Sequence, residues 1–507
     1  MADLILVQPV VGNMDSIRSA PSLPLALLEA ASLVDARGYR VKLIDQRLDR
    51  RWREHLISEL KAGPLCVGTT AMTGPQIGGA LEASRVVKEN SDIPMVWGGI
   101  HASLLPEQTL RDPRVDFVVK GEGEETLLEL VRTLGNGKEF DGVRGLWWKD
   151  PGGGIHANPE RPFLDMDALP DPPFHLVNPR DYMPLYMGMR TIYLQSSRGC
   201  PYPCAYCYNT AFNDRKWRML SAERTVALIR KVRDLGAENI WFVDDEVIIQ
   251  RRRLEDICKS ILAESLDIHW EVQGIRVNNA LRMDDAMLRL VERSGCVRLI
   301  FGVESASEKI LRMVKRNIPL EQVRAVNRRL RETGIIAHFN FMCGFPEETP
   351  EDLRQTVEFV LSLLRENPRA RIAGIHIFTP YPGTELYDYV VRKGYFTPPQ
   401  TLEGWADFGW MTTPMATQDK ESLESLFFCS LFADRKWNEN LTNPLARAAA
   451  AAYGPVARWR MKNLFFKFMF EKRLARALYP PHMPNHPRAA SEPFERRAPP
   501  APAEPCG

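Results

Sequence analysis

Residues 197–210 read SSRGCPYPCAYCYN and place Cys200, Cys204 and Cys207 within eight positions. The chain of 507 residues has only nine cysteines, so this C-x3-C-x2-C cluster indicates a chemical site. Structural zinc usually takes paired C-x2-C ligands, and the sequence has no second pair, although a distant histidine is an alternative fourth ligand. Iron–sulfur clusters are held by thiolates. Three thiolates on a four-iron cluster leave one iron open for another ligand.

A regular alternation of strands and helices begins just before the cysteine cluster. Six apolar strand patterns, separated by helical patterns, are TIYLQSS, NIWFVDD, HWEVQGIRV, VRLIFGVES, IIAHFNFMCGF and RIAGIHIFTPY. Six βα units predict a partial or full TIM-type parallel barrel over residues 191–394. Its chemistry is expected at the C-terminal ends of the strands, and the cysteine cluster directly follows the first strand.

The first 140 residues form an earlier βα series. Its predicted strands lie in the short apolar stretches LILVQPV, RVKLIDQ, PLCVGTTAM, IPMVWGG and VDFVVKG, and helical patterns lie between them. This alternation predicts an α/β domain with a doubly wound, Rossmann-like (flavodoxin-like) parallel sheet. Such sheets bind ligands at the C-terminal ends of their strands.

The remaining segments of the chain lack this alternation of strands and helices. Residues 141–190 include the proline-rich stretch ALPDPPFHLVNP and are predicted to be an interdomain linker. Residues 395–478 are expected to be mostly helical. Residues 479–507 are rich in proline and poor in large apolar side chains, which predicts a disordered tail.

Composition limits the location and the partners. The net charge of +2 gives no general attraction to nucleic acid. The N-terminus, MADLILVQPVVGNMD, lacks the basic start and long apolar run of a secretory signal. No apolar stretch of the sequence reaches the ~20 residues that cross a bilayer. We therefore expect a cytoplasmic protein whose cysteines are reduced.

The cysteine cluster resembles the signature of radical S-adenosylmethionine (radical SAM) enzymes over about residues 190–390. Its spacing, the aromatic Tyr206 before the last cysteine and its place after the first strand carry this resemblance. The resemblance implies that Cys200, Cys204 and Cys207 hold a 4Fe–4S cluster whose open iron is chelated by S-adenosylmethionine. In that family an electron from the cluster cleaves the sulfonium, and the resulting 5′-deoxyadenosyl radical abstracts a hydrogen atom. An electron donor such as flavodoxin or ferredoxin is implied as a partner.

The same resemblance implies where S-adenosylmethionine binds. Asp244 and Asp245 end the second strand, where the family holds the methionyl amino group, although the usual Gly-Gly-Glu is absent. Glu246 follows these two aspartates, and the alternative for it is a position that faces solvent. Arg276 is expected either to pair with the methionyl carboxylate or to form a salt bridge at the barrel rim. Further cofactor contacts are expected from Tyr206, Glu304, Ser305 and Gly344, the last in a turn that contacts adenine or is purely structural.

The front domain resembles the cobalamin-binding domain that is fused to one class of radical SAM enzymes. The stretches that carry the resemblance are PSLPLALLEAASLVDARGYRVKLID, VWGGIHASLLPEQTL and VDFVVKGEGEETLLEL. Gly98 and Gly99 are expected to let the backbone approach the nucleotide tail of cobalamin. Thr69, Thr70 and Thr73 are expected to form hydrogen bonds with that tail.

One departure from other cobalamin proteins concerns cobalt ligation. The Asp-x-His-x-x-Gly loop that supplies a lower axial histidine is missing, since PVVGNMDSIRSAP has no histidine. His101 lies in the Gly-Gly loop. We expect it to be a loop or edge residue in preference to an axial ligand of the cobalt. Relatives of this class do without the histidine, so cobalamin is still expected. A domain that has lost cobalamin is the alternative.

Together the two resemblances predict a cobalamin-dependent radical SAM enzyme that acts on a small molecule. The expected activity is methyl transfer to an unactivated carbon or phosphorus of a biosynthetic intermediate. One S-adenosylmethionine would methylate cobalamin and a second would generate the radical. Two alternatives stay open: an anaerobic oxidative cyclase of the magnesium-protoporphyrin IX monomethyl ester type, and a non-catalytic cobalamin or iron–sulfur sensor.

The C-terminal stretch GPVARWRMKNLFFKFMFEKRLARALY mixes basic and large apolar residues at helical spacing. This pattern is typical of helices that lie on a membrane surface. A helix that caps the barrel, with its arginines and lysines outward, is the alternative.

Overall fold

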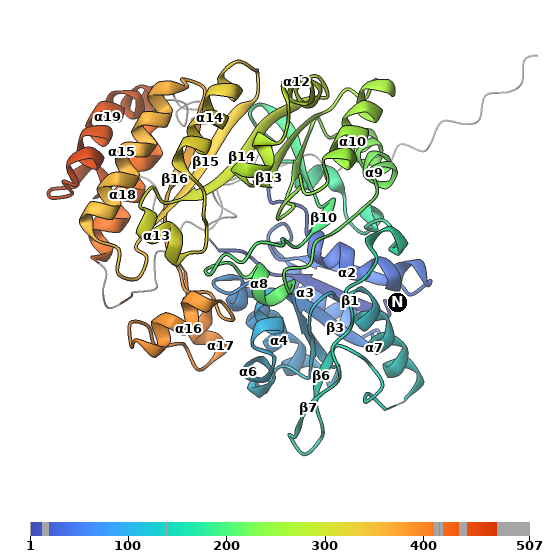
Figure 1. The fold of residues 1–507 in the computed structure, drawn as a ribbon. Coiled ribbons are helices and arrows are strands. Elements are labelled where there is room, and N and C mark those ends of the chain that lie inside the picture. The colour runs from blue at the N-terminus through green and yellow to red at the C-terminus, as the bar shows by residue number, and fades with distance from the viewer. Residues whose placement is uncertain are drawn as a thin grey trace, which may run out of the picture.

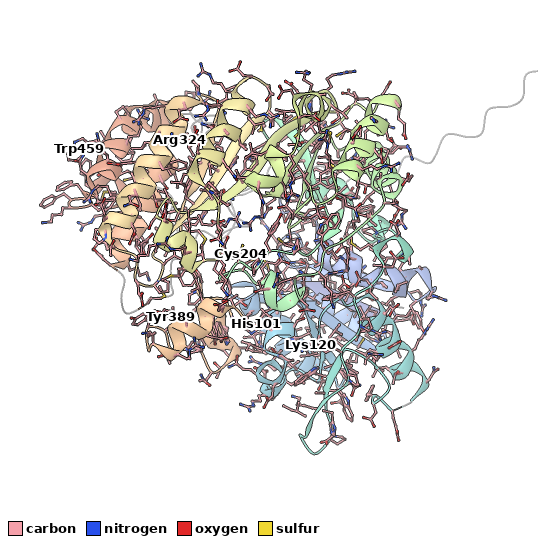
Figure 2. The ribbon with its side chains drawn as sticks, viewed as in Figure 1. His101, Lys120, Cys204, Arg324, Tyr389 and Trp459 are labelled. Carbon is pink, nitrogen blue, oxygen red and sulfur yellow. The ribbon has the colours of Figure 1, made fainter. Side chains whose placement is uncertain are left out.

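The computed structural model describes residues 2–12, 20–137, 139–409, 415, 419–434 and 444–473. Two seven-stranded sheets organise these residues (Figure 1). The first sheet belongs to the N-terminal domain, and the second belongs to the part of the chain that carries the cysteine cluster. Cys204 lies between the two (Figure 2).

The first sheet has the strand order β2-β1-β3-β4-β5-β6-β7. Its strands are β1 (Leu4–Gln8), β2 (Val41–Asp45), β3 (Cys66–Thr70), β4 (Met95–Gly98), β5 (Phe117–Val119), β6 (Leu146–Lys149) and β7 (Ile155–Ala157). The strands β1 to β5 pair in parallel. The order 2-1-3-4-5 is that of flavodoxin-like folds, in which ligands bind where the winding direction changes, between β1 and β3. The predicted fold class of this domain is confirmed.

Part of the segment that the sequence presents as a linker extends this sheet. The strand β6 pairs antiparallel with β5, and β7 pairs antiparallel with β6. The turn between them, Asp150 to Gly154, is rich in glycine and is closed by the Asp150 carboxylate, which accepts the N–H groups of Gly152 and Gly154. Short strands next to a proline and three glycines give little periodicity, which explains why the sequence suggested a linker.

Helices cover both faces of the first sheet because parallel strands bury both faces. These helices are α2 (Leu25–Ala36), α3 (Trp52–Leu60), α4 (Gln76–Asn90), α5 (Gly99–Leu104), α6 (Pro106–Arg111) and α7 (Glu124–Asn136). Ile5 and Val67 belong to the core beneath α3 and α4. Leu4 and Leu6 point the other way, into the core beneath α2 and α7.

The second sheet is wound in one direction, in the order β16-β15-β14-β13-β12-β9-β8. Its strands are β8 (Leu185–Tyr186), β9 (Met189–Leu194), β12 (Asn239–Phe242), β13 (His269–Ile275), β14 (Cys296–Glu304), β15 (Ile336–Cys343) and β16 (Arg371–Ile377). The six strands from β9 onwards pair in parallel, and β8 is antiparallel to β9. In the described part of the chain β8 and β16 are the two edge strands and do not pair with each other, so the barrel is partial.

Seven helices accompany the partial barrel. They are α9 (Ala222–Asp234), α10 (Arg251–Ala263), α11 (Val277–Leu281), α12 (Asp285–Arg293), α13 (Glu308–Met313), α14 (Leu320–Arg331) and α15 (Pro350–Glu366). The apolar faces of these helices, except α13, share one large core with the outward side chains of the strands. The short helix α13 instead buries Ile310 in the core that includes Ile5 and Val67 of the first domain. The opposite, concave side of the sheet is therefore left for polar groups.

The segment after the barrel returns to the first domain. The helices α16 (Glu385–Arg392) and α17 (Leu402–Ala406) lie beside α4 and α6 (Figure 1). Trp405 of α17 is fully buried, and its Nε1–H donates to Gln108 Oε1 at 2.6 Å. This short helix therefore fastens the second half of the chain to the first.

Two longer helices end the described chain. The helix α18 (Lys420–Ala433) packs against β16, and α19 (Pro444–Asn463) packs against α15 and α18. Among the described residues no helix is both long and apolar enough to cross a membrane. The predicted tail, residues 479–507, lies outside the described residues.

Candidate functional site

The cysteine loop leaves the C-terminal end of β9 through a two-stranded ribbon, β10 (Ser197–Arg198) and β11 (Arg218–Met219). Gly199 starts the loop with a φ of +82°, and a Cβ there would lie 2.0 Å from the carbonyl oxygen of Lys216. A side chain at this position would force the two strands of the ribbon apart. The glycine before Cys200 is therefore a requirement of the loop path.

The three cysteines are free thiols on this loop. The Cys204 sulfur is buried and accepts N–H groups from Arg276 and Arg316, each at 3.5 Å. Burial raises the pKa of the Cys200 and Cys207 thiols to about 12. A metal reverses this effect, because coordination deprotonates a thiol outright.

The donor set fits a cluster better than a single ion. Among the described residues no group of three or more His, Cys, Asp or Glu side chains gathers closely enough for one metal ion. Thiolates of a four-iron cluster bind different irons and stand further apart than ligands of one ion. Three thiols on one loop, with two guanidinium groups beside Cys204, suit an anionic iron–sulfur cluster.

Arg316 links the cysteine loop to the end of β14. It lies against Cys204, donates to the Tyr206 hydroxyl at 3.4 Å, and forms an ion pair with Glu304 at 3.7 Å. Tyr206 in turn donates to Glu304 Oε1 at 2.8 Å. Glu304 has a φ of +73°, an uncommon conformation for a residue with a side chain, and such residues gather at functional sites. Sequence reasoning missed Arg316.

The structure gives Asp244 and Asp245 protein partners. Asp244 is 1% exposed and accepts from Ser196 N and Oγ at 2.7 Å and from Ser197 Oγ at 2.5 Å. Asp245 accepts from Gly199 N at 2.9 Å and from the Tyr208 hydroxyl at 3.0 Å. Both carboxylates therefore brace the start of the cysteine loop.

Glu246 and Arg276 carry buried polar atoms without a partner. Glu246 is 1% exposed, so its solvent-facing alternative is wrong. Its Oε2 accepts the Arg276 backbone N–H at 2.9 Å, whereas Glu246 Oε1 and Arg276 Nε have no hydrogen-bond partner among the described residues. Burial raises the pKa of Glu246 to about 7. An unpaired carboxylate oxygen beside an unpaired guanidinium N–H suits a zwitterionic amino acid group.

Arg276 is held in place by its neighbours. Its guanidinium lies 4.0 Å from the centre of the Tyr202 ring, a cation–π contact, and Tyr202 donates to Asn279 at 3.0 Å. Within the described ranges no carboxylate lies at ion-pair distance from Arg276. The rim salt bridge that the sequence left open is thus not formed in this part of the chain.

Two other residues expected to contact a cofactor form hydrogen bonds within the protein. Ser305 is fully buried, lies 3.1 Å from Thr356 Oγ1 of α15, and accepts the N–H of Ser307. Gly344 has a φ of +73° and donates its N–H to Glu348. Burial raises the pKa of Glu348 to about 7. These contacts shape the turns after β14 and β15.

A cavity of about 250 Å³ lies between the two domains at the strand ends of both sheets. Its walls from the first domain include Thr69, Thr70, Gly98 and Gly99, and its walls from the second include Gln195, Arg198, Tyr208 and Asp245. Gly99 has a φ of +88°, and a Cβ there would lie 2.5 Å from Thr70 Oγ1. Four of the five residues expected to bind cobalamin thus line one space, and that space reaches the cysteine loop through Asp245.

The fifth residue, Thr73, lies outside this lining and contacts His101. The two side chains are 3.1 Å apart, from Thr73 Oγ1 to His101 Nδ1. His101 is fully buried against Trp405, with ring centres 5.5 Å apart, and burial lowers the pKa of His101 to about 4. His101 does not line the cavity, but it lies in the short helix α5 and not in a loop as the sequence suggested. Thr69 lines the cavity, but its hydroxyl donates to the Val7 carbonyl at 3.0 Å.

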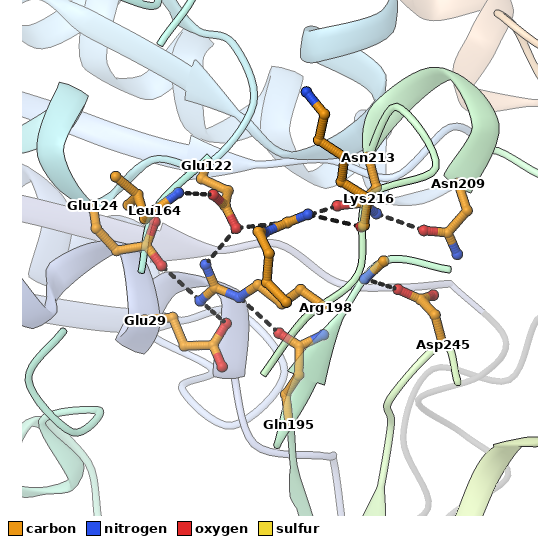
Figure 3. Close-up of polar contacts among 12 residues, drawn as sticks. Glu29, Glu122, Glu124, Leu164, Gln195, Arg198, Asn209, Asn213, Lys216 and Asp245 are labelled. Atoms are coloured by element: carbon orange, nitrogen blue, oxygen red, sulfur yellow. Dashed lines mark hydrogen bonds and ion pairs between the residues drawn. The ribbon is translucent and has the colours of Figure 1, made fainter. Parts of the chain in front are cut away.

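A charged network crosses the domain boundary next to the cavity (Figure 3). Arg198, two residues before Cys200, donates to Glu124 at 2.6 Å and to Glu29 and Glu122 at 3.1 Å. Arg218 of β11 also donates to Glu122, at 2.8 Å. Burial raises the pKa of Glu29 to about 7. In the sequence, the acidic stretch KGEGEE indicated part of this network, because it contains Glu122 and Glu124. Sequence reasoning did not identify Arg198 or Arg218.

Comparisons with known proteins agree with this two-part site. Residues 194–360 match the radical SAM superfamily, and residues 20–131 match the B12 binding domain. An uncharacterized methyltransferase of Pyrococcus horikoshii is 31% identical over 397 residues, which are 78% of this chain and 84% of that protein. The anaerobic magnesium-protoporphyrin IX monomethyl ester cyclase of Rubrivivax gelatinosus is 30% identical over 65% of this chain and 59% of its own length.

Solved structures show the same fold. The cobalamin-dependent S-adenosylmethionine radical enzyme OxsB, with aqua-cobalamin and S-adenosylmethionine bound, aligns with a TM-score of 0.73. The alignment covers 94% of this chain and 74% of OxsB at 18% identity. The methyltransferase TsrM from Kitasatospora setae aligns with a TM-score of 0.64 at 20% identity, over 78% of this chain and 77% of TsrM.

Fold and site thus define a two-domain enzyme, in which a flavodoxin-like cofactor domain precedes a partial barrel that carries three neighbouring thiols. The chain belongs to the radical SAM superfamily, in the group with an N-terminal B12-binding domain. Its cofactors are accordingly a 4Fe–4S cluster, S-adenosylmethionine and cobalamin.

Proposed function

We propose that the protein transfers a methyl group to an unactivated carbon or phosphorus atom of a small molecule. When bound, the cluster with S-adenosylmethionine supplies a 5′-deoxyadenosyl radical and cobalamin supplies the methyl group. The observation that carries the proposal is the shared cavity, whose walls come from the strand ends of both domains. The relative from Pyrococcus horikoshii is named a methyltransferase, which supports the same reaction.

In this proposal the second domain orients the radical source. Cys200, Cys204 and Cys207 hold the cluster, and Arg276 and Arg316 lie against the sulfur of Cys204. The unpaired oxygen of Glu246 accepts from the methionyl ammonium group, and the unpaired Nε–H of Arg276 donates to the methionyl carboxylate. Asp244 and Asp245 act indirectly, because their oxygens already fix the cysteine loop.

The first domain presents the other cofactor. Gly98 and Gly99 remove side-chain bulk at the end of β4, and Thr70 supplies a hydroxyl beside them. Across the cavity, Gln195 and Arg198 belong to the strand and ribbon that lead into the cysteine loop. A small molecule held between these walls is in reach of both domains. A reduced flavodoxin or ferredoxin is the proposed electron donor.

The test uses the full chain, purified without oxygen in the presence of cobalamin and reduced with dithionite. It is incubated with S-adenosylmethionine that carries a trideuterated methyl group and with the small-molecule fraction of cells that express the protein. We expect 5′-deoxyadenosine, S-adenosylhomocysteine and one metabolite that gains the label. The matched control replaces all three cluster cysteines by alanine and should form none of the three.

Two other outcomes would contradict methyl transfer. A product that loses hydrogen and gains oxygen from water without the label would indicate a cyclase, the activity for which the Rubrivivax gelatinosus relative is named. Cobalamin and iron bound in full amounts, with no 5′-deoxyadenosine formed, would indicate a sensor.

A further inference from the structure

The end of α19 and the segment after it expose large apolar side chains to solvent. Phe468 is 83% exposed, Phe470 72%, Trp459 54%, Val456 45% and Phe465 38%. Single exposed apolar residues are ordinary, but five within fifteen positions form a patch that calls for an explanation. Trp459 lies at the outer edge of the molecule, away from Cys204 (Figure 2).

Basic side chains lie among these apolar residues. Lys462, Lys467 and Arg473 are exposed. The acidic residue of the stretch, Glu471, forms an ion pair with Arg460 at 2.8 Å and accepts from the Tyr453 hydroxyl at 3.0 Å. Every exposed ionic side chain between residues 456 and 473 is therefore basic. We call the five apolar and three basic residues together the aromatic–basic patch.

The patch is held outward by buried contacts beneath it. The guanidinium of Arg460 donates to three backbone carbonyls, those of Phe465 at 3.2 Å, Lys467 at 3.1 Å and Phe468 at 3.4 Å. Met461 and Met469 are buried on the inner side of the same segment. The chain after α19 is thus folded back on the helix. With the backbone tied down, Phe466 packs against the core, whereas Phe465, Phe468 and Phe470 are exposed.

A second set of inward contacts anchors the segment to α18. Lys472 turns away from solvent and donates to Glu424 at 3.2 Å and to Ser425 at 3.1 Å. The charges of this segment are therefore divided by position. Arg460, Glu471 and Lys472 form internal ion pairs, whereas the exposed charged side chains are all positive.

We propose that the aromatic–basic patch docks the protein on an anionic membrane surface. Aromatic rings favour the interface between water and lipid, and lysines beside them are attracted to anionic headgroups. The cores of protein–protein interfaces, in contrast, are depleted in lysine. Docking of this kind is peripheral and independent of the reaction proposed above, since none of the patch residues lines the cofactor cavity.

The test measures sedimentation of the full-length holoenzyme with lipid vesicles. Vesicles of phosphatidylcholine with phosphatidylglycerol should bind the protein, and vesicles of phosphatidylcholine alone should bind it far more weakly. Binding should weaken as salt is raised, because salt screens the headgroup charge. The affinity of the variant F468S/F470S for these vesicles should fall by about tenfold or more, since two exposed rings no longer enter the lipid.

Charge variants separate the patch from the overall charge of the molecule. The variant K462Q/K467Q should bind roughly 25-fold more weakly, at about fivefold for each lysine. The matched control K61Q/R289Q removes two exposed basic groups, one directly after α3 and one in α12, and should bind as the unmodified protein does. All variants should cleave S-adenosylmethionine at the unmodified rate, which checks that they fold.

Two results would overturn the proposal. One is unmodified protein that does not sediment with the phosphatidylglycerol vesicles, or patch variants that bind as tightly as the control. The other is a dimer, seen by light scattering, that F468S/F470S converts to a monomer while vesicle binding stays unchanged. In that case the patch is an interface between two copies of the chain.

Discussion

The two sheets present their strand ends in different ways. At the ends of β3 and β4 the first sheet offers glycines and threonines, and Gly99 has no room for a side chain. At the ends of β9, β12, β13 and β14 the second sheet offers thiols, carboxylates and guanidinium groups, among them Cys204, Glu246 and Arg276. In the proposed function, the first sheet makes space for a large cofactor, and the second supplies ligands to a charged one.

This difference determines which substitutions each half tolerates. A site made of space fails when atoms are added, whereas a site made of ligands fails when atoms or charges are removed. The winding of the sheets follows the same division, because the first changes direction between β1 and β3 and opens a crevice, whereas the second curls around its own polar face. The following experiments test the comparison at single positions.

The largest effect is expected at the cysteine loop. Alanine at Cys200, Cys204 or Cys207 removes an iron ligand that no neighbouring group replaces. The purified variants should lack the brown colour, hold iron only at background level and form no detectable 5′-deoxyadenosine. Cys258→Ala is the matched control, since Cys258 is also a buried thiol but lies in α10. Full iron content in the three variants would disprove the cluster assignment.

Glu246 is expected to show the next largest effect. The change Glu246→Gln keeps the shape but removes the negative charge that the methionyl ammonium group needs. S-adenosylmethionine should bind roughly 10- to 100-fold more weakly, as for a lost hydrogen bond to a charged group. Equilibrium dialysis of the reconstituted protein measures this affinity, with iron content as the check on the cluster.

Asp244→Asn is the control for Glu246. Because Asp244 is bonded to Ser196 and Ser197, this change should lower the melting temperature and leave the affinity of the folded protein unchanged. If Asp244→Asn weakened binding and Glu246→Gln did not, the assignment from the sequence would be the right one.

Gly99 tests the first sheet by addition of atoms. Gly99→Ala places a methyl group 2.5 Å from Thr70 Oγ1 at a φ of +88°, so the free energy of unfolding should fall by about 1–3 kcal/mol. Cobalamin, followed by its absorbance in a titration, should bind more weakly. Gly137→Ala is the control, because Gly137 also has a positive φ, of +63°, but has open space around it. Equal cobalamin affinity in both variants would show that the end of β4 does not contact the cofactor.

The strands and the cysteine site followed from the sequence, whereas the contacts between them did not. Apolar runs such as NIWFVDD give the strands, and the spacing of the cysteines gives the cluster. Three acids in a row, Asp244 to Glu246, cannot be ranked by periodicity, because the chain turns at the end of the strand. Arg316 reaches Cys204 from 112 residues away, and its role depends on the path of a loop that no local pattern reports.

The smallest effect concerns the charged network between the domains. The pKa of Glu29 rises from 4.5 to about 7 in the folded protein because it is buried. Between these two values the folded state holds a proton that the unfolded state has lost, so stability should fall as pH rises from about 4.5 to 7. The melting temperature of the unmodified protein should therefore decrease with rising pH in the range pH 5–8. In Glu29→Gln the part of this decrease that Glu29 causes should be absent.

The control for Glu29 is a glutamate on the surface. Glu107→Gln removes an exposed carboxylate that pairs only with Arg111, and it should keep the slope of the unmodified protein. An unchanged slope in Glu29→Gln would show that Glu29 does not stay protonated beside Arg198.

The helix α17 has a consequence for how the protein is made. Trp405 covers His101 and bonds to Gln108, yet it follows Gln108 by 297 residues in the chain. At about 5–20 residues per second, a ribosome needs roughly 15–60 s to synthesise that interval. During this time the nascent first domain lacks the cover that Trp405 provides. Completion of the enzyme is therefore a late event of translation, and a ribosome that stops after the barrel would release a first domain with an uncovered apolar face.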